Sequence, residues 1–333
     1  MSKHKLENMI QNSLLIVLLL FSFSVFSQRD STKISFVAYW AKGDSYDFKV
    51  TKIKTGWSND ILTKRDSSQY VANFKVLDST ENTYKIQWTY KNTILNSFQI
   101  KAQNLFEDKQ VIDEILKKND LSKIIYETNE LGEFLHILNW KELSETTNLL
   151  MEEIVRIFEL KNSENIDILK NTMSPFIEIY SSKQGIEQLA VKELQYFHYL
   201  LGYEYDITEP IVFEQEYPNM LGGDPINAEA ILTFGEVDFE NYYCTVKEET
   251  TLNEVDVKKT MYQFVERMNA PELKMEETLN NVFFDIKDTN IYQFYYYPGI
   301  PHYIYQKRET ILKLNEINIK NLEELFIELL YDE

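Results

Sequence analysis

Strict alternation of apolar and polar residues marks the chain after residue 33. It runs through residues 46–51, 70–76 and 84–90, where aromatic and aliphatic residues occupy every second position. A period of two places such residues on one face of a β-strand, and the intervening lysines fall on the other face. The pattern predicts a twisted antiparallel sheet with a basic outer face.

A period of 3.6 residues replaces this alternation in the middle of the chain. It predicts helices over residues 104–119, 142–160 and 181–201. Between the first two helices, the runs KIIYETN and EFLHILNW are typical of a β-hairpin that turns near Leu131-Gly132. The middle of the chain is therefore expected to be mainly helical, with one hairpin.

Strands return after residue 208 and continue to about residue 250. Asn253 then has the position of a helix N-cap. The run NIYQFYYYPGIPHYIYQKRETIL predicts a hairpin turning at 298–301, and the apolar spacing of 322–330 predicts a C-terminal helix. Strands and helices segregate along the chain. The sequence therefore favours an α+β fold, with antiparallel sheet partly wrapped by amphipathic helices and an open half-barrel as one form.

Composition divides the chain into four segments. Residues 1–27 are predicted to be a signal peptide, 28–103 a basic antiparallel β segment, and 104–205 a mainly helical segment with a β-hairpin. Residues 206–333 are predicted to be an acidic α+β segment with a C-terminal helix. A chain of this length can bury one large core, so residues 28–333 are also compatible with one continuous domain.

The N-terminal segment has the parts of a secretory signal peptide. A basic start at 1–5 precedes an apolar core at 14–26, and the small residues Val25 and Ser27 precede a cleavage site before Gln28. The core is shorter than the roughly 20 residues of a membrane span, although an uncleaved anchor is the competing interpretation. No cysteine follows the core, which argues against a lipoprotein. The sequence predicts a secreted or periplasmic protein with a Sec-type leader and no transmembrane span after cleavage.

Charge is unevenly distributed. The formal net charge is −19, yet residues 33–101 hold 11 basic and 6 acidic residues, while the part from Ala102 onward holds 20 basic and 45 acidic residues. Binding of nucleic acid needs clustered cations, so the acidic part argues against nucleic acid as a partner. The asymmetry fits ordinary solubility, or a basic sheet that docks an acidic partner. Cys244 is the only cysteine, which excludes an intramolecular disulfide.

The segment WAKGDSYDFKV at residues 40–50 raises the question of a serine nucleophile. Gly43-Asp44-Ser45 after an apolar run resembles the start of a GDSL-type hydrolase, which also needs a late Asp-x-x-His. None of the three histidines after the leader has an aspartate three residues before it. Ser45 also opens a run of strand residues instead of a helix. We therefore interpret Gly43-Asp44 as a turn before a strand.

Residue spacing indicates no metal or cofactor site. The histidines lack HExxH spacing, and no glycine-rich phosphate loop or EF-hand pattern occurs. Paired acids such as Glu214 with Glu216, or Asp285 with Asp288, are the remaining source of chemistry, because a glycosidase uses two facing carboxylates. Such pairs also arise by chance on an acidic surface. The sequence therefore predicts no catalytic residue, no metal ligand and no cofactor.

Aromatic residues of the predicted C-terminal hairpin are the stronger signal. Tyrosine combines apolar area with a polar end, which suits ligand-lined cavities and interfaces, and it also suits the rim of a sheet. Both faces of the first strand of the hairpin carry aromatic rings. The candidate ligand or interface residues are Tyr292, Phe294, Tyr296, Tyr303 and Tyr305.

The chain resembles a group of uncharacterised secreted proteins of Bacteroidetes. The stretches that carry the resemblance are spread over most of the chain after the leader. They are YWAKGDSYDFKVTKIKTGW (39–57), TNELGEFLHILNWKEL (128–143), SSKQGIEQLAVKELQYFHY (181–199) and GGDPINAEAILTFGEVDFENYYC (222–244). The resemblance implies a location in the cell envelope of such a bacterium. It implies no catalytic residue and no ligand.

Together these patterns favour a non-enzymatic binding protein of the bacterial cell envelope. Its partner would be an apolar or lipid-like molecule held in a concavity, or another envelope protein. One alternative is a carbohydrate-active hydrolase, which would need two buried acids facing each other across a cleft. A second alternative is an interaction scaffold, in which the basic sheet of 33–101 docks an acidic partner. That alternative fails if the lysines of this sheet pair with the chain's own acids.

Overall fold

The computed structural model describes the chain in segments. The described residues are 32–91, 122–161, 170, 174, 177–178, 181–187, 192–217, 219, 223–267, 283–314 and 316–331. The predicted leader at 1–27 and the predicted helix at 104–119 lie outside the described residues.

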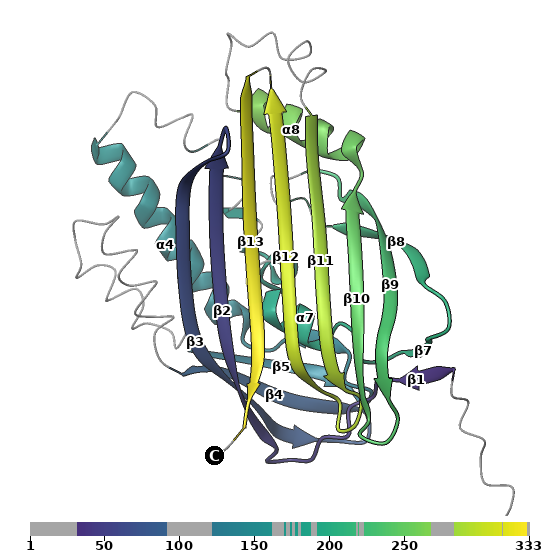
Figure 1. The fold of residues 1–333 in the computed structure, drawn as a ribbon. Coiled ribbons are helices and arrows are strands. Elements are labelled where there is room, and N and C mark those ends of the chain that lie inside the picture. The colour runs from purple at the N-terminus through teal and green to yellow at the C-terminus, as the bar shows by residue number, and fades with distance from the viewer. Residues whose placement is uncertain are drawn as a thin grey trace, which may run out of the picture.

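Most of the described chain forms one large antiparallel sheet that curves around a concave face (Figure 1). Its 11 strands lie in the order β6-β5-β4-β3-β2-β13-β12-β11-β10-β9-β8. The edge strands β6 and β8 do not pair with each other, so the sheet is open. The strands are β2 (Ser45–Ser58), β3 (Ile61–Ser79), β4 (Thr83–Lys91), β5 (Lys123–Asn129), β6 (Phe134–Ile137), β8 (Ile211–Tyr217), β9 (Ile226–Asp238), β10 (Tyr243–Leu252), β11 (Phe283–Tyr295), β12 (Ile300–Leu314) and β13 (Ile317–Leu330). A second sheet pairs β1 (Lys33–Ser35) with β7 (Glu204–Asp206).

Aromatic side chains fill the concave face of the first half of the sheet. Phe48, Phe74 and Trp88 come from β2, β3 and β4 and are fully buried, as their alternation predicts. Phe197 of helix α7 (Lys192–His198) packs against all three rings, with centroid distances of 5.3, 5.1 and 5.6 Å. Burial of one such ring contributes about 1.5–3 kcal/mol, so apolar contact holds α7 in the hollow of the sheet.

The remaining described helices are α4 (Trp140–Lys161), α6 (Lys183–Gly185) and α8 (Glu254–Arg267). Of these, α8 packs on the concave face against β9, β10 and β11. The predicted cap of α8 is confirmed, because Oδ1 of Asn253 accepts hydrogen bonds from the N–H groups of Val255 at 3.0 Å and Asp256 at 3.2 Å. None of the helices in the described part of the chain is long and apolar enough to cross a membrane.

The predicted α+β class is wrong, because one large sheet dominates the described residues and the helices are too few to wrap it. The predicted C-terminal helix at 322–330 is strand β13. Its apolar residues fit both the helical period of 3.6 and the strand period of two. In the structure Leu325 and Ile327, two positions apart, are buried. Strands β2 and β12 bind β13 on its two sides and satisfy its backbone groups. This pairing outweighs the helix propensity of its leucines and glutamates.

Residues 36–40, here termed the strap, close one end of the concavity. The strap follows β1 and alternates buried with more exposed residues, so that Phe36, Ala38 and Trp40 point inward. The N–H groups of Phe36, Ala38 and Tyr39 donate to carbonyl oxygens of three different loops. The acceptors are, in the same order, Tyr203 at 2.9 Å, Leu131 at 2.9 Å and Pro298 at 3.0 Å. The strap therefore ties together three loops that are far apart in sequence.

Gly299 allows the closest approach between the strap and the β11–β12 turn. The indole Nε1 of Trp40 donates to the carbonyl oxygen of Gly299 at 3.2 Å. A Cβ on Gly299 would lie 2.6 Å from the carbonyl oxygen of Val37, and the φ angle of +89° is one that glycine adopts readily. This position therefore requires glycine for two independent reasons.

Lysines of the first half of the sheet pair with acids of the second half. Lys49 and Lys54 of β2 lie 2.6 and 2.8 Å from the carboxylates of Glu328 and Glu323 of β13. Each of these pairs is substantially exposed, so each contributes little to stability. They nevertheless neutralise, within the folded molecule, part of the charge difference between the basic and the acidic parts of the chain.

An ion pair between an exposed lysine and a buried carboxylate joins β2 to α7. The carboxylate of Glu193, which is 2 % exposed, contacts the ammonium group of Lys52 and accepts a hydrogen bond from the Tyr70 hydroxyl at 2.5 Å. Burial raises the pKa of the Glu193 carboxyl, but the charge and hydrogen bond of Lys52 and the bond from Tyr70 outweigh it, so the pKa lies below its ordinary value. The helix is thus fixed by a polar contact as well as by Phe197.

The contact between the strap and Gly299 generates the first prediction. Gly299→Ala should lower the free energy of unfolding by about 2–5 kcal/mol, because a left-handed backbone strain and a steric clash add together. Gly43→Ala is the matched control, since Gly43 has φ +98° and a Cβ added there would meet no atom within 4 Å. It should cost only about 1 kcal/mol. Urea unfolding of both variants measures the difference, and equal losses would contradict the proposed close contact.

Candidate functional site

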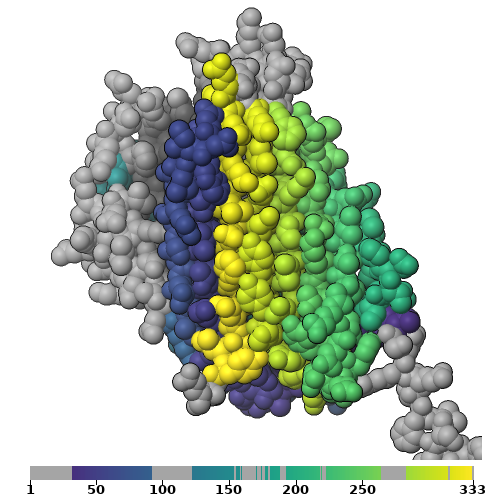
Figure 2. Space-filling view, in the orientation of Figure 1, coloured from purple at the N-terminus to yellow at the C-terminus, as the bar shows by residue number. Residues whose placement is uncertain are grey.

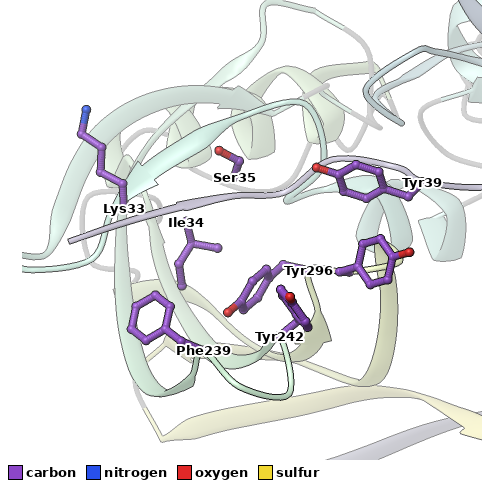
Figure 3. Close-up of a pocket in the computed structure, with 8 residues that line it drawn as sticks. Lys33, Ile34, Ser35, Tyr39, Phe239, Tyr242 and Tyr296 are labelled. Atoms are coloured by element: carbon purple, nitrogen blue, oxygen red, sulfur yellow. The ribbon is translucent and has the colours of Figure 1, made fainter. Parts of the chain in front are cut away.

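A pocket lined by tyrosines lies at the end of the sheet that the strap closes (Figure 3). It forms where β1 and the strap meet the β9–β10 turn and the β11–β12 turn, and its volume is about 430 Å³. In Figure 3 the buried side chain of Ile34 points toward the aromatic rings. We term it the tyrosine pocket, and its lining residues are Lys33, Ile34, Ser35, Tyr39, Phe239, Tyr242, Tyr296 and Tyr297.

Four tyrosine rings of this pocket contact one another in series. Tyr39 lies 5.1 Å from Tyr297, Tyr297 lies 5.5 Å from Tyr242, and Tyr242 lies 5.8 Å from Tyr296, measured between ring centroids. Tilted and edge-to-face pairs at such distances are worth about 0.5–1.5 kcal/mol each. Tyr39 and Tyr297 are nevertheless 54 % and 55 % exposed. The series therefore presents aromatic surface that the protein itself does not cover.

The backbone of Tyr242 is strained. Its φ angle is +56°, a conformation that glycine and asparagine adopt far more readily than tyrosine. Asp238 shapes the turn before it, since Oδ1 accepts the N–H groups of Glu240 at 2.9 Å and Asn241 at 3.0 Å, and Oδ2 accepts Nδ2 of Asn241 at 2.7 Å. The bonds from Asn241 hold the pKa of the Asp238 carboxyl below its usual range. Strain of this kind clusters at functional positions.

The charged rim of the pocket is compensated within the protein. The ammonium group of Lys33 lies 3.4 Å from the carboxylate of Glu204, and the hydroxyl of Ser35 donates to the same carboxylate at 3.1 Å. The lining contains no carboxylate, imidazole or thiol. The pocket can therefore hold an apolar or aromatic body beside phenol hydroxyls.

The five predicted aromatic candidates separate onto two faces of the sheet. Tyr296 lines the tyrosine pocket. Tyr292 and Phe294 lie on the concave face and are fully buried in the core. Tyr303 and Tyr305 alternate with a buried residue between them and lie on the outer face, where both are partly exposed. The structure thus brings only one of the five to the pocket.

Sequence reasoning missed the other aromatic residues of the pocket. Tyr39 comes from the strap, Phe239 and Tyr242 from the β9–β10 turn, and Tyr297 from the β11–β12 turn. Strand alternation cannot identify residues that lie in turns. The available signal was aromatic residues at the edges of two predicted turns, DFENYY and YYYPG.

A second pocket lies on the concave side, between α7 and strands β8 and β9. Its volume is about 470 Å³ and its lining is mainly apolar, with Phe134, Leu201, Phe213 and Leu232 among its residues. His198 also lines it. We term it the apolar pocket.

His198 is a buried neutral histidine at this second pocket. Its Nδ1 lies 2.8 Å from the carbonyl oxygen of Gly132, which can only accept, so Nδ1 carries the proton. Its Nε2 then accepts from the hydroxyl of Tyr126 at 2.9 Å. Burial lowers the pKa of His198 to about 4, and the bond to Gly132 opposes this only in part. The residue is thus a satisfied core histidine and not a poised catalytic base.

The buried acids of the concave face are fully engaged with neighbours. Glu248 accepts hydrogen bonds from the Tyr199 hydroxyl and from Nδ2 of Asn290, both at 2.7 Å. Asp288 accepts two hydrogen bonds from the guanidinium group of Arg308, at 2.7 and 2.5 Å. Neither acid lines the tyrosine pocket or the apolar pocket. Within the described segments, no group of three or more histidine, cysteine or acidic residues could hold a metal ion.

Ser45 is placed as the sequence predicts, at the end of a turn. The carboxylate of Asp44 accepts the N–H group of Ala41 at 2.8 Å, and Gly43 has φ +98°. The hydroxyl of Ser45 accepts a hydrogen bond from Nδ2 of Asn73 at 2.9 Å and opens strand β2. This partner is an amide and not the imidazole that activates a serine nucleophile in a catalytic triad. The contact agrees with the interpretation of Ser45 as a turn residue.

Comparison with known proteins gives only weak likenesses. No protein-family model matches the chain, and no curated protein matches it. One solved structure that the comparison matches is a Bacteroides fragilis NCTC 9343 protein of YmcC-like fold that is described as exported, at 8 % identity and a TM-score of 0.20, covering 90 % of this chain and 100 % of that one. Another is Ail, the attachment invasion locus protein of Yersinia pestis, at 6 % identity and a TM-score of 0.14, covering 87 % and 100 %. Likenesses at these scores carry no argument, so membership of the Bacteroidetes group stays a prediction.

Burial of His198 generates a prediction about pH. Its pKa is lower in the folded state than the ordinary 6.5, so the unfolded chain binds the proton first as pH falls. The stability that neutral His198 contributes is present above pH 6.5 and should fall by on the order of 2 kcal/mol by pH 4.5. Glu193, whose pKa is lowered, loses its contribution only at lower pH.

Unfolding by urea across this window measures the effect. In His198→Gln the amide can still donate to Gly132, and the decline between pH 6.5 and 4.5 should largely disappear. The control His136→Gln, at a half-buried histidine beside Glu127, should retain it. An unchanged decline in the His198 variant would show that other groups titrate in this range.

Proposed function

We propose that the protein is a non-enzymatic extracytoplasmic binding protein that holds a small apolar or lipid-like molecule in the tyrosine pocket. The observation that carries the proposal is the series of four contacting tyrosines around a pocket of about 430 Å³ whose lining has no carboxylate, imidazole or thiol. Ligand pockets commonly measure roughly 300–1,000 Å³ and are mostly apolar and aromatic, with few polar groups.

The lining restricts the chemistry of the ligand. Ile34 and Phe239 offer apolar surface, and the tyrosine rings offer flat faces with hydroxyl groups. Lys33 is paired with Glu204, so the lining has no uncompensated charge for a buried ion. The buried part of the ligand is therefore uncharged, and any charged group it carries remains at the mouth.

A carbohydrate hydrolase is less well supported. Such an enzyme needs two carboxylates facing a cleft, one of them free to exchange a proton. The buried acids Glu248 and Asp288 are instead saturated by Tyr199, Asn290 and Arg308. Glu133 is the one acid in the linings of the tyrosine pocket and the apolar pocket. A third pocket, along α4, is lined by Glu152, Glu159 and Glu178, but Glu159 is paired with Lys170 at 2.5 Å.

An interaction scaffold that uses the basic sheet is also less well supported. Its condition was that the lysines of residues 33–101 be available to an acidic partner. Lys33, Lys49, Lys52 and Lys54 instead contact acids from the second part of the chain. The location of the proposed function, secreted or periplasmic, rests on the predicted leader at 1–27.

Native mass spectrometry tests the proposed function. The protein should be secreted by its own host, so that the leader is removed by the cell, and purified without detergent. We expect additional mass on the order of several hundred daltons, lost on organic extraction, because an apolar ligand dissociates slowly from such a pocket into water. A clean apoprotein mass would contradict a carried ligand.

Tyr242→Gly separates binding from folding. Glycine relieves the left-handed strain, so the midpoint of thermal unfolding should stay within a few degrees of the parent. Removal of the central ring of the series should lower ligand occupancy about tenfold or more. Tyr262→Ala is the control, because Tyr262 is exposed on α8 and does not line the pocket. Equal occupancy in both variants would place the ligand elsewhere.

A further inference from the structure

The apolar pocket lies where the open sheet does not close. Both edge strands line it, with Phe134 from β6 and with Ile211 and Phe213 from β8, and α7 contributes His198. Helix α7 lies behind the strands in Figure 1, whereas Figure 2 shows the outer face of the sheet, over which the side chains of β11 to β13 pack side by side. The apolar pocket is thus a feature of the concave side, and its lining shares no residue with that of the tyrosine pocket.

Glu133 gives the apolar pocket its charge. It is the one charged side chain of the lining, because His198 is neutral. Oε2 of Glu133 accepts a hydrogen bond from Nδ2 of Asn129 at 3.1 Å, and Oε1 accepts a longer one from the hydroxyl of Tyr203 at 3.4 Å. Both donors are neutral groups, so they orient the carboxylate without cancelling its charge.

The charge of Glu133 is left without a cation. Among the residues that the structure describes, no lysine or arginine lies within 4 Å of its carboxylate. Lys33, on the neighbouring strand β1, is already paired with Glu204. The negative charge extends to the rim, where it raises the pKa of Tyr203, with smaller contributions from partial burial and from their hydrogen bond. The pocket therefore favours a positively charged group beside Glu133.

Aromatic rings stand next to this carboxylate. Tyr203 and Tyr205 both line the pocket, and their ring centroids lie 6.1 Å apart. The faces of such rings attract an ammonium group that lies within about 6 Å of the centroid. Leu201 and Leu232, which are almost completely buried, supply apolar surface in the same lining. The lining thus combines an acidic, aromatic rim with an apolar interior.

We propose that the apolar pocket binds an organic cation, in which an alkylated ammonium group is attached to an apolar chain. The ammonium group lies beside Glu133 and against the rings of Tyr203 and Tyr205, and the chain packs against Leu201 and Leu232. A charge that leaves water is costly unless it is paired, and Glu133 provides the pairing. The same carboxylate repels an anion, so charge selects the ligand as much as shape does. This site is independent of the tyrosine pocket and of the proposed function.

Isothermal titration calorimetry of the host-secreted protein tests the proposal. The probes are octyltrimethylammonium, 1-octanol and octanoate, which have similar apolar chains and differ in charge. We expect the cation to bind at least about tenfold more tightly than the alcohol, because it alone gains the carboxylate and the aromatic faces. Octanoate should bind more weakly than the alcohol.

Three variants locate the site of binding. Glu133→Gln keeps an oxygen that can accept from Asn129 and Tyr203 but removes the charge. It should weaken binding of the cation about tenfold and leave that of 1-octanol unchanged. Glu130→Gln is the matched control, because it makes the same charge change in the same β5–β6 turn at an exposed residue outside the lining. Tyr242→Gly alters the other pocket and should leave binding of the cation unchanged.

Each alternative outcome overturns the proposal. Binding of none of the probes, or equal binding of all three, would show that the pocket does not select a cation. Equal losses in Glu133→Gln and Glu130→Gln, or no loss in Glu133→Gln, would show that the carboxylate of Glu133 is not the partner. A loss in Tyr242→Gly alone would place the cation in the tyrosine pocket. The midpoint of thermal unfolding of each variant verifies that it is folded.

Discussion

The backbone hydrogen bonds of the strap are the constraint on which the candidate site depends. Three N–H groups within four residues bind three separate loops, and one of these, the β11–β12 turn, carries two rings of the tyrosine pocket. The N–H group of Tyr296 in this turn donates to the carbonyl oxygen of Tyr242 at 2.9 Å, which ties the β9–β10 turn to it. Tyr39 is itself part of the strap, and its N–H group donates to the carbonyl oxygen of Pro298, the residue that follows Tyr297. The aromatic series is therefore assembled by main-chain geometry, and the tyrosine side chains need only complete it.

The concave face changes character from one half of the sheet to the other. On β2 to β4 it is aromatic, whereas on β10 to β12 it carries buried polar groups such as Glu248 and Asp288. Helix α7 is suited to both environments, with Phe197 directed to the first and Tyr199, just beyond its end, bonded to Glu248. Buried charges are costly unless they are paired. The polar half of the face therefore adds little to the net free energy of folding, but it specifies the position of α7.

Much of the strand pattern was predictable, because alternation along β2 to β4 and the hairpins β5–β6 and β11–β12 depend on local sequence. Strand β13 was not, since Leu322, Leu325 and Leu329 satisfy a helical spacing as well, and only the flanking strands resolve the ambiguity. The sequence indicated a cavity or interface lined by aromatic residues, but it did not identify most of the residues that line the pocket. Tyr296 was identified, whereas its neighbours lie in turns and in the strap, where no period exists and tertiary contacts alone bring the rings together.

The position of β13 has a consequence for how the molecule is made. It lies at the centre of the sheet, with five strands on each side, yet it is synthesised after every other described strand of that sheet. Until it emerges, β2 and β12 are two unpaired edges facing each other, and such edges invite pairing with other chains. A nascent or truncated chain that lacks residues 317–330 would therefore present two five-stranded halves, each with an unpaired edge strand that can bind another chain. Its fate would depend on chaperones and proteases instead of on the finished fold.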